Sequence, residues 1–118
     1  MAQVHTTTLL ADHKGVSRPK VCGDEYMVDA VVDVTSHLAS GAIIPASDFG
    51  LSTIHCATIC GTEGANAHVP SLLTTATGGY TSSSSIALMF TALDGTNATV
   101  ANDGNPACAV RLRVWGNL

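Results

Sequence analysis

The chain has 118 residues and a mass of 12.0 kDa, which is enough for one domain and too little for two cores of ordinary size. Its formal net charge of -4 disfavours broad electrostatic binding to nucleic acid, and no apolar run reaches the roughly 18 residues of a membrane-spanning helix. We therefore expect a soluble protein with no nucleic-acid partner and no membrane partner.

Charged residues make up only 12% of the chain, about half the share found in an average soluble domain. This composition fits a protein whose faces are covered by neighbours, and it fits equally a soluble domain of modest thermal stability. The chain also starts without a basic and then apolar leader. Its four cysteines are expected to be reduced in a cytosol, where free thiols most often pack as small buried hydrophobes.

Residues 1–20 show no clear strand pattern, and we expect them to form an extended N-terminal arm ahead of a single β-domain at residues 21–118. The arm is locally basic, because Lys14, Arg18 and Lys20 are three of the five cations in the chain. These three residues are a candidate docking patch for an acidic partner surface. The alternative is that they only solubilise a frayed end.

Three later segments alternate with the period of two that is typical of half-buried strands. Apolar residues occupy every second position from Tyr26 to Val34, from Ile86 to Phe90 and from Cys108 to Val114. A weaker strand is expected from Leu51 to Cys60, where Cys56 and Cys60 share the parity of Ile54 and are predicted to be buried with it.

Turn signals separate these segments, among them Gly41 through Pro45, and one helical turn is expected near Pro45 to Asp48. Short strands at this spacing predict an all-β fold, either an antiparallel β-sandwich or a jelly-roll-like barrel. In the last strand Trp115 shares the outward face with Arg111 and Arg113. It is a candidate interface anchor, or alternatively a cover for the outside of the sheet.

The residue types for catalysis are present, but their spacing does not support a site. Cys56 and Cys60 form one x₃ pair without the second pair that a structural zinc site needs. The pattern G-x-S-x-G and the phosphate-binding glycine motifs are absent, and Asp29 and Asp33 are interpreted as the solvated side of a strand. We expect no catalytic residue, no metal and no cofactor, and therefore a protein that is not an enzyme.

The segment Gly41 to Ile54, GAIIPASDFGLSTI, resembles a run found in small structural proteins of tailed-phage particles. In those proteins a strand ends in a glycine-containing turn, and P-A-x-x-x-G-L-S-x-I leads into the next strand. The preceding strand and the final AVRLRVWG segment lie where that pattern places them, so the resemblance covers about half of the chain. The chain departs from the pattern at Ile54 to Cys60 and in the Ser/Thr-rich stretch from Ser71 to Ser85.

This resemblance implies a virion component that is assembled in the host cytoplasm. The most economical role is a capsid decoration, or cement, protein that binds across junctions of the major capsid protein and stabilises the shell. Such a protein is expected to form a homo-oligomer, with a trimer favoured because it matches a local symmetry axis. The alternatives are a host-attachment or carbohydrate-binding β-domain of a tail or head fibre and, as a third class, an enzyme with a hidden site.

Overall fold

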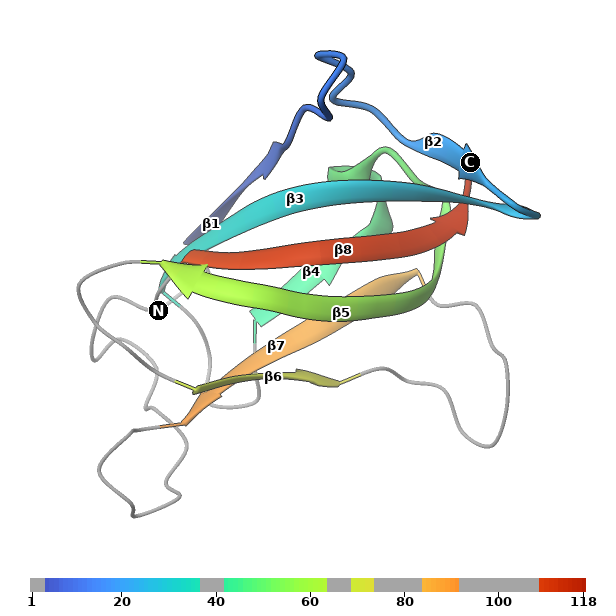
Figure 1. The fold of residues 1–118 in the computed structure, drawn as a ribbon. Helices are drawn as coiled ribbons and strands as arrows, with labels where there is room; N and C mark the ends of the chain where they lie inside the picture. The colour runs from blue at the N-terminus through green and yellow to red at the C-terminus, as the bar shows by residue number, and fades with distance from the viewer. Residues whose placement is uncertain (1–3, 37–41, 64–68, 74–83, 92–108) are drawn as a thin grey trace.

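The computed structural model describes residues 4–36, 42–63, 69–73, 84–91 and 109–118, and these residues fold into two antiparallel sheets packed face to face (Figure 1). The larger sheet has the strand order β1-β3-β8-β5, with β2 paired to β3 beside β1. The smaller sheet has the order β4-β7-β6. The chain is therefore an all-β antiparallel sandwich, as predicted.

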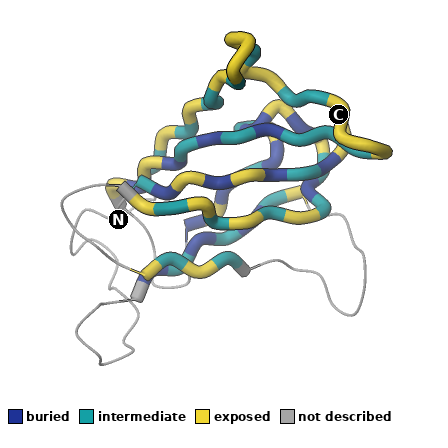
Figure 2. The backbone as a smooth tube through the Cα atoms, in the orientation of Figure 1, coloured by how far each residue is buried: buried dark blue, intermediate teal, exposed yellow. Residues whose placement is uncertain are grey.

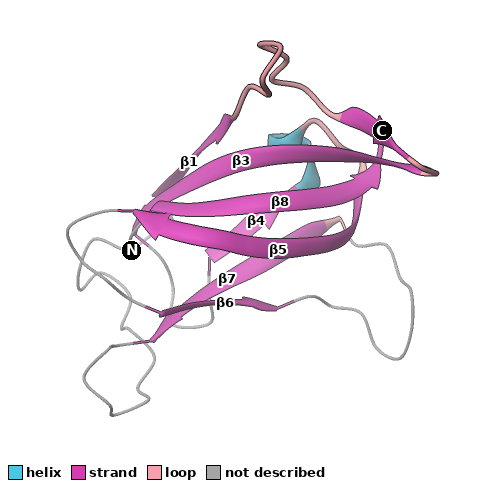
Figure 3. Ribbon diagram, in the orientation of Figure 1, coloured by secondary structure: helices cyan, strands magenta, loops and turns pink. Residues whose placement is uncertain are grey.

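The strands of the larger sheet are β1 (Val4–Leu9), β2 (Lys20–Cys22), β3 (Glu25–Ser36), β5 (Thr53–Glu63) and β8 (Ala109–Asn117). Those of the smaller sheet are β4 (Ala42–Pro45), β6 (Val69–Leu73) and β7 (Ser85–Thr91). Within the described ranges the one helical element is the 3-10 turn η1 (Ala46–Phe49), at the position where a helical turn was expected (Figure 3). The reading of Gly41 through Pro45 as a turn is wrong for Ala42–Pro45, which pairs with β7 as β4.

Gly50 ends this 3-10 turn and starts the approach to β5. Its φ of 76° lies in the left-handed region, which glycine adopts without the steric cost that a side chain adds. The next residue, Leu51, is then buried in the core. The local sequence P-A-x-x-x-G-L thus turns the chain from the smaller sheet into the larger one.

The core lies between the two sheets, and Figure 2 shows its buried positions alternating with exposed ones along the strands. Each of the three strands with clear alternation contributes its apolar face, which confirms the predicted faces of β3, β7 and β8 for the described residues. Their core residues are Val28, Ala30, Val32, Val34, Ile86, Leu88, Phe90, Val110, Leu112 and Val114. The core also contains Phe49 of η1, Ile44 of β4 and Ile54 of β5.

The expected extended N-terminal arm is not confirmed. Val4–Leu9 forms β1 and pairs along β3 from Val4↔Ser36 to Leu9↔Ala30. Asp48 then ties this strand to η1, because its Oδ2 accepts hydrogen bonds from His5 Nε2 at 2.8 Å and Thr7 Oγ1 at 3.1 Å. The first part of the predicted arm is therefore a strand of the larger sheet, held by backbone pairing and side-chain contacts.

The predicted burial of Cys56 and Cys60 is wrong, and the cause is an irregularity in β5. The pairing with β8 shifts between Ile54 and Cys56, where His55 is the extra residue of a β-bulge. A bulge of one residue reverses which parity points inward. After it Ala57 and Ile59 pack against the core and Cys56 is exposed. Cys60, which is also exposed, is the extra residue at a second shift in the pairing, between Ile59 and Gly61.

Candidate functional site

A row of side chains crosses the outer face of the larger sheet near its Trp115 end. The register places Lys20 of β2 opposite Met27 of β3, Met27 opposite Trp115 of β8, and Trp115 opposite Cys56 of β5. Directly opposed side chains on one face lie within contact distance. Lys20, Met27 and Trp115 are half-buried and Cys56 is exposed, so the indole lies between a thioether and a thiol, which are both soft apolar neighbours. We call these four residues the Trp115 row.

An ion pair lies one step further along the same face. Arg113 donates from Nε to Asp29 Oδ1 at 2.7 Å and from Nη2 to Asp29 Oδ2 at 3.0 Å, which is the two-pronged geometry favoured by guanidinium and carboxylate. The bond from Arg113 holds the pKa of Asp29 below its usual range, and the bond to Asp29 raises the pKa of Arg113. The pair fixes a charged border beside Trp115.

A second charged contact fixes the Lys20 end of the row. The Asp12 carboxylate accepts hydrogen bonds from the backbone N–H groups of Val16 and Lys14 at 2.9 and 2.8 Å, and from Lys20 Nζ at 2.9 Å. The bond from the Val16 N–H, followed by the bond from Lys20, holds the pKa of Asp12 well below its usual range. The turn before β2 is therefore tied to the sheet by an ionised side chain.

His55, the extra residue of the bulge, is held at the adjoining end of the sheet. Its Nδ1 lies 2.9 Å from Glu25 Oε2 and its Nε2 lies 3.2 Å from Asn117 Nδ2. Because a carboxylate accepts and an amide nitrogen donates, Nδ1 carries the proton and Nε2 is the acceptor in the neutral ring. The contacts of His55 with Glu25 and Asn117 thus join β3, β5 and β8. They hold the bulge that places Cys56 beside Trp115.

Gly116 is required at the same end for a steric reason. A Cβ atom at this position would overlap the carbonyl oxygen of Thr53 on the adjoining strand. The close approach allows β5 to start beside the end of β8, where Ser52 N donates to Asn117 O at 2.8 Å. The position of the bulge relative to Trp115 depends on this contact.

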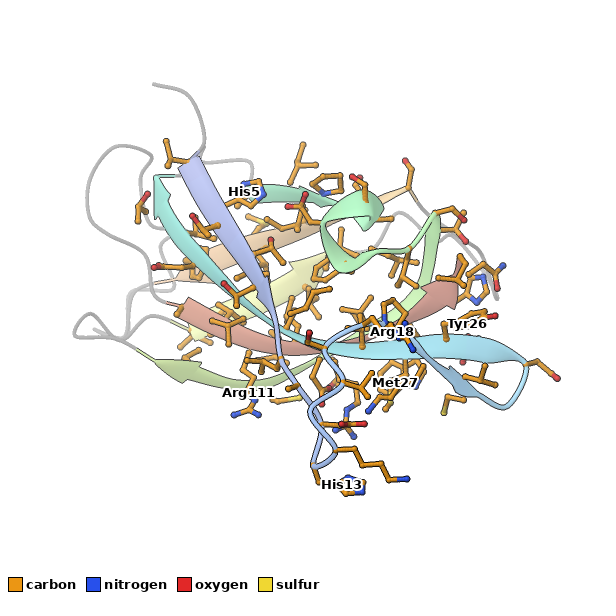
Figure 4. All side chains as sticks on the ribbon, turned by 90° about the horizontal axis from the view of Figure 1, so that it is seen from above. His5, His13, Arg18, Tyr26, Met27 and Arg111 are labelled. Atoms are coloured by element: carbon orange, nitrogen blue, oxygen red, sulfur yellow. The ribbon has the colours of Figure 1, made fainter. Side chains whose placement is uncertain are left out.

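The structure brings together only some of the predicted interface residues. Lys20 and Trp115 belong to one row, with Met27 between them. Neither the composition nor the local pattern of the sequence predicted this arrangement. Lys14 and Arg18 are exposed in the connection between β1 and β2. Figure 4 shows Met27 and Arg111 on one side of the sheet, with the turn that carries His13 on that side too, whereas His5 lies near η1 on the other.

Within the described ranges no group of three or more His, Cys, Asp and Glu side chains could hold a metal ion. The thiols of Cys22, Cys56 and Cys60 are free and exposed, and Cys108 lies outside the described residues. Asp29 is engaged with Arg113, and Asp33 is exposed on the outer face, as predicted. No helix in the described ranges has the length and apolar character to cross a membrane.

Met27, Cys56 and the contact of Glu25 with His55 were not identified from the sequence. Their roles arise from the register between strands and from the bulge, which local alternation does not specify. One signal was present: Ile54 and Ile59 are both apolar at an odd separation of five, which a regular strand cannot place on one face. That change of parity indicates a bulge between them.

Comparisons of the chain with models of known protein families, with curated proteins and with solved structures gave no match.

Proposed function

We propose that this protein is a non-enzymatic structural component of a phage particle, a capsid decoration protein that binds the shell through the outer face of its larger sheet. The observation that supports this role best is the Trp115 row, where a tryptophan is flanked by Met27 and Cys56 on an outer sheet face. Tryptophan, methionine and arginine are the residue types enriched at the centres of protein interfaces.

The charges around the row favour attachment to a polar protein surface, and they help to make this attachment specific. Arg113 and Lys20 are already paired, whereas Lys14, Arg18 and Arg111 make no ion pair with any residue in the described ranges. Unpaired cations at the rim of an interface increase the rate of association and help to fix orientation. Because such charges are screened by salt, attachment is expected to weaken as ionic strength rises.

A carbohydrate-binding module of a fibre is the second class, and it receives less support. Such modules need exposed aromatic rings, but Phe49 and Phe90 are fully buried and Tyr26 packs against the core. Among the described aromatic residues, only Trp115 belongs to an outer sheet face.

Co-sedimentation of the protein with undecorated phage capsids tests the proposal. Wild-type protein should pellet with the capsids at low ionic strength, less so at high ionic strength, and Trp115→Ala should bind at least about tenfold more weakly. Ser47→Ala on η1, away from the outer face, is the matched control. Absence of wild-type binding would contradict the decoration role, and equal binding by Trp115→Ala would contradict the assignment of the site.

A further inference from the structure

The smaller sheet differs from the larger one in its charge. None of the residues in β4 (AIIP), β6 (VPSLL) and β7 (SIALMFT) is Asp, Glu, Lys or Arg. In the larger sheet β2, β3, β5 and β8 each carry at least one of these residues, and β1 carries none. An antiparallel sheet with one face on the core normally has polar residues on its other face. Packing of the core therefore does not explain why the outer side of the smaller sheet lacks charged residues.

Alternation and register identify the residues on that outer side. Since Ile44, Ile86 and Leu88 point into the core, the neighbours of opposite parity point outward. Ile43 lies opposite Ala87, and Ser71 lies opposite Met89. We call the outward residues Ile43, Val69, Ser71, Ala87 and Met89 the uncharged face.

The two outer strands expose apolar side chains on this face. Ile43 is 55% exposed and Val69 is 43% exposed, and both are among the few large hydrophobic residues that the described part of the chain exposes. They lie on the two outer strands, on either side of Ala87 and Met89 of β7.

We propose that the uncharged face is the surface through which copies of this protein contact one another. Each copy has a net charge of -4, so identical molecules repel, and a contact surface without charges avoids placing like charges opposite each other. A partner with a charged surface would form no ion pairs here, because this face has no charges to offer. Self-association through apolar side chains needs no such complementarity.

The two sheets pack face to face (Figure 1), so the uncharged face of the smaller sheet and the Trp115 row of the larger sheet are on opposite sides of the sandwich. A copy can therefore contact a neighbour through one sheet while the other sheet remains open to a different partner. The inference concerns the isolated protein in solution, so it does not depend on attachment to a shell, and its failure would leave the proposed function untouched.

Sedimentation velocity of the full-length protein over a concentration series tests the inference. Wild-type protein should form a dimer or trimer, and Ile43→Glu should raise the dissociation constant at least about tenfold, because each contact would bury a carboxylate. Val21→Glu is the matched control: Val21 is 71% exposed on β2 of the other sheet, so the same chemical change should leave assembly unaltered.

A second variant and a folding control separate assembly from stability. Ser71→Arg places a charge at an exposed position of the same face and should also weaken association, and both variants should keep the wild-type circular dichroism spectrum. A monomeric wild type would overturn the inference. So would Ile43→Glu and Ser71→Arg variants that associate like the wild type, or a Val21→Glu variant that dissociates equally.

Discussion

Leu112 is the residue whose truncation tests the arrangement of the core most sharply. It lies on β8, which pairs with β3 on one side and β5 on the other, and its neighbours across the strands are Ala30 and Ile59. Its side chain is 0% exposed. Leu112→Ala removes three carbons, and at about 0.8 kcal/mol for each buried CH₂ group the transfer contribution is about 2.4 kcal/mol.

The cavity left behind increases this cost. Both neighbouring strands are fixed by hydrogen bonding to β8, and the small side chain of Ala30 cannot fill the space. We therefore expect Leu112→Ala to lower the free energy of unfolding by about 3 to 4 kcal/mol, within the range of buried leucine truncations. For a domain with a total stability of about 5 to 15 kcal/mol this is a large share.

Urea denaturation followed by circular dichroism measures the change as a lower midpoint with an unchanged slope. Arg111→Ala is the control, since this exposed neighbour on the same strand should change stability by less than about 0.5 kcal/mol. A loss of under half a kcal/mol in Leu112→Ala, or one no larger than in the control, would show that the inward face of β8 has been assigned wrongly.

Three further perturbations follow from the contacts described above. The pKa of Asp12 is lower in the folded protein than in the unfolded chain. The ionised carboxylate therefore stabilises the fold above about pH 4, and this stabilisation is lost as pH falls further. The urea midpoint of unfolding should fall less between pH 5 and pH 2 in Asp12→Asn than in the wild type. Gly116→Ala should cost about 1 to 3 kcal/mol in urea denaturation, because the new Cβ overlaps the Thr53 backbone; wild-type stability would contradict the close approach. Deletion of residues 1–20 removes β1 and the start of β2. It should lower the thermal midpoint of unfolding and promote aggregation through the uncovered edge of β3. An unchanged midpoint would instead support a separate N-terminal arm.

The faces of β3, β7 and β8 were predictable because each strand has one face in the core and one outside, and burial imposes the alternation that the sequence displays. β1 was not predictable in this way. Its sequence VHTTTL is polar on both faces, and its positions alternate only between exposed and half-buried. What holds it is backbone pairing with β3 and the contact of Asp48 with His5, which join residues far apart in the chain.

The candidate site was predictable to a similar extent. The parity of the last strand placed Trp115 on the outward face beside Arg113, and the structure agrees. The alignment of Trp115 with Lys20 and Met27 depends on the register of three strands, and the exposure of Cys56 depends on the bulge at His55. Neither follows from local pattern, because register is fixed by contacts between distant segments.

We propose that the outer face of the larger sheet attaches this protein to a capsid. An electron cryo-microscopy reconstruction of undecorated capsids incubated with the protein tests it most directly. We predict added density on the outside of the shell, with the Trp115 row against the shell and the smaller sheet turned away from it. Capsids without added density, or with the smaller sheet against the shell, would contradict the claim.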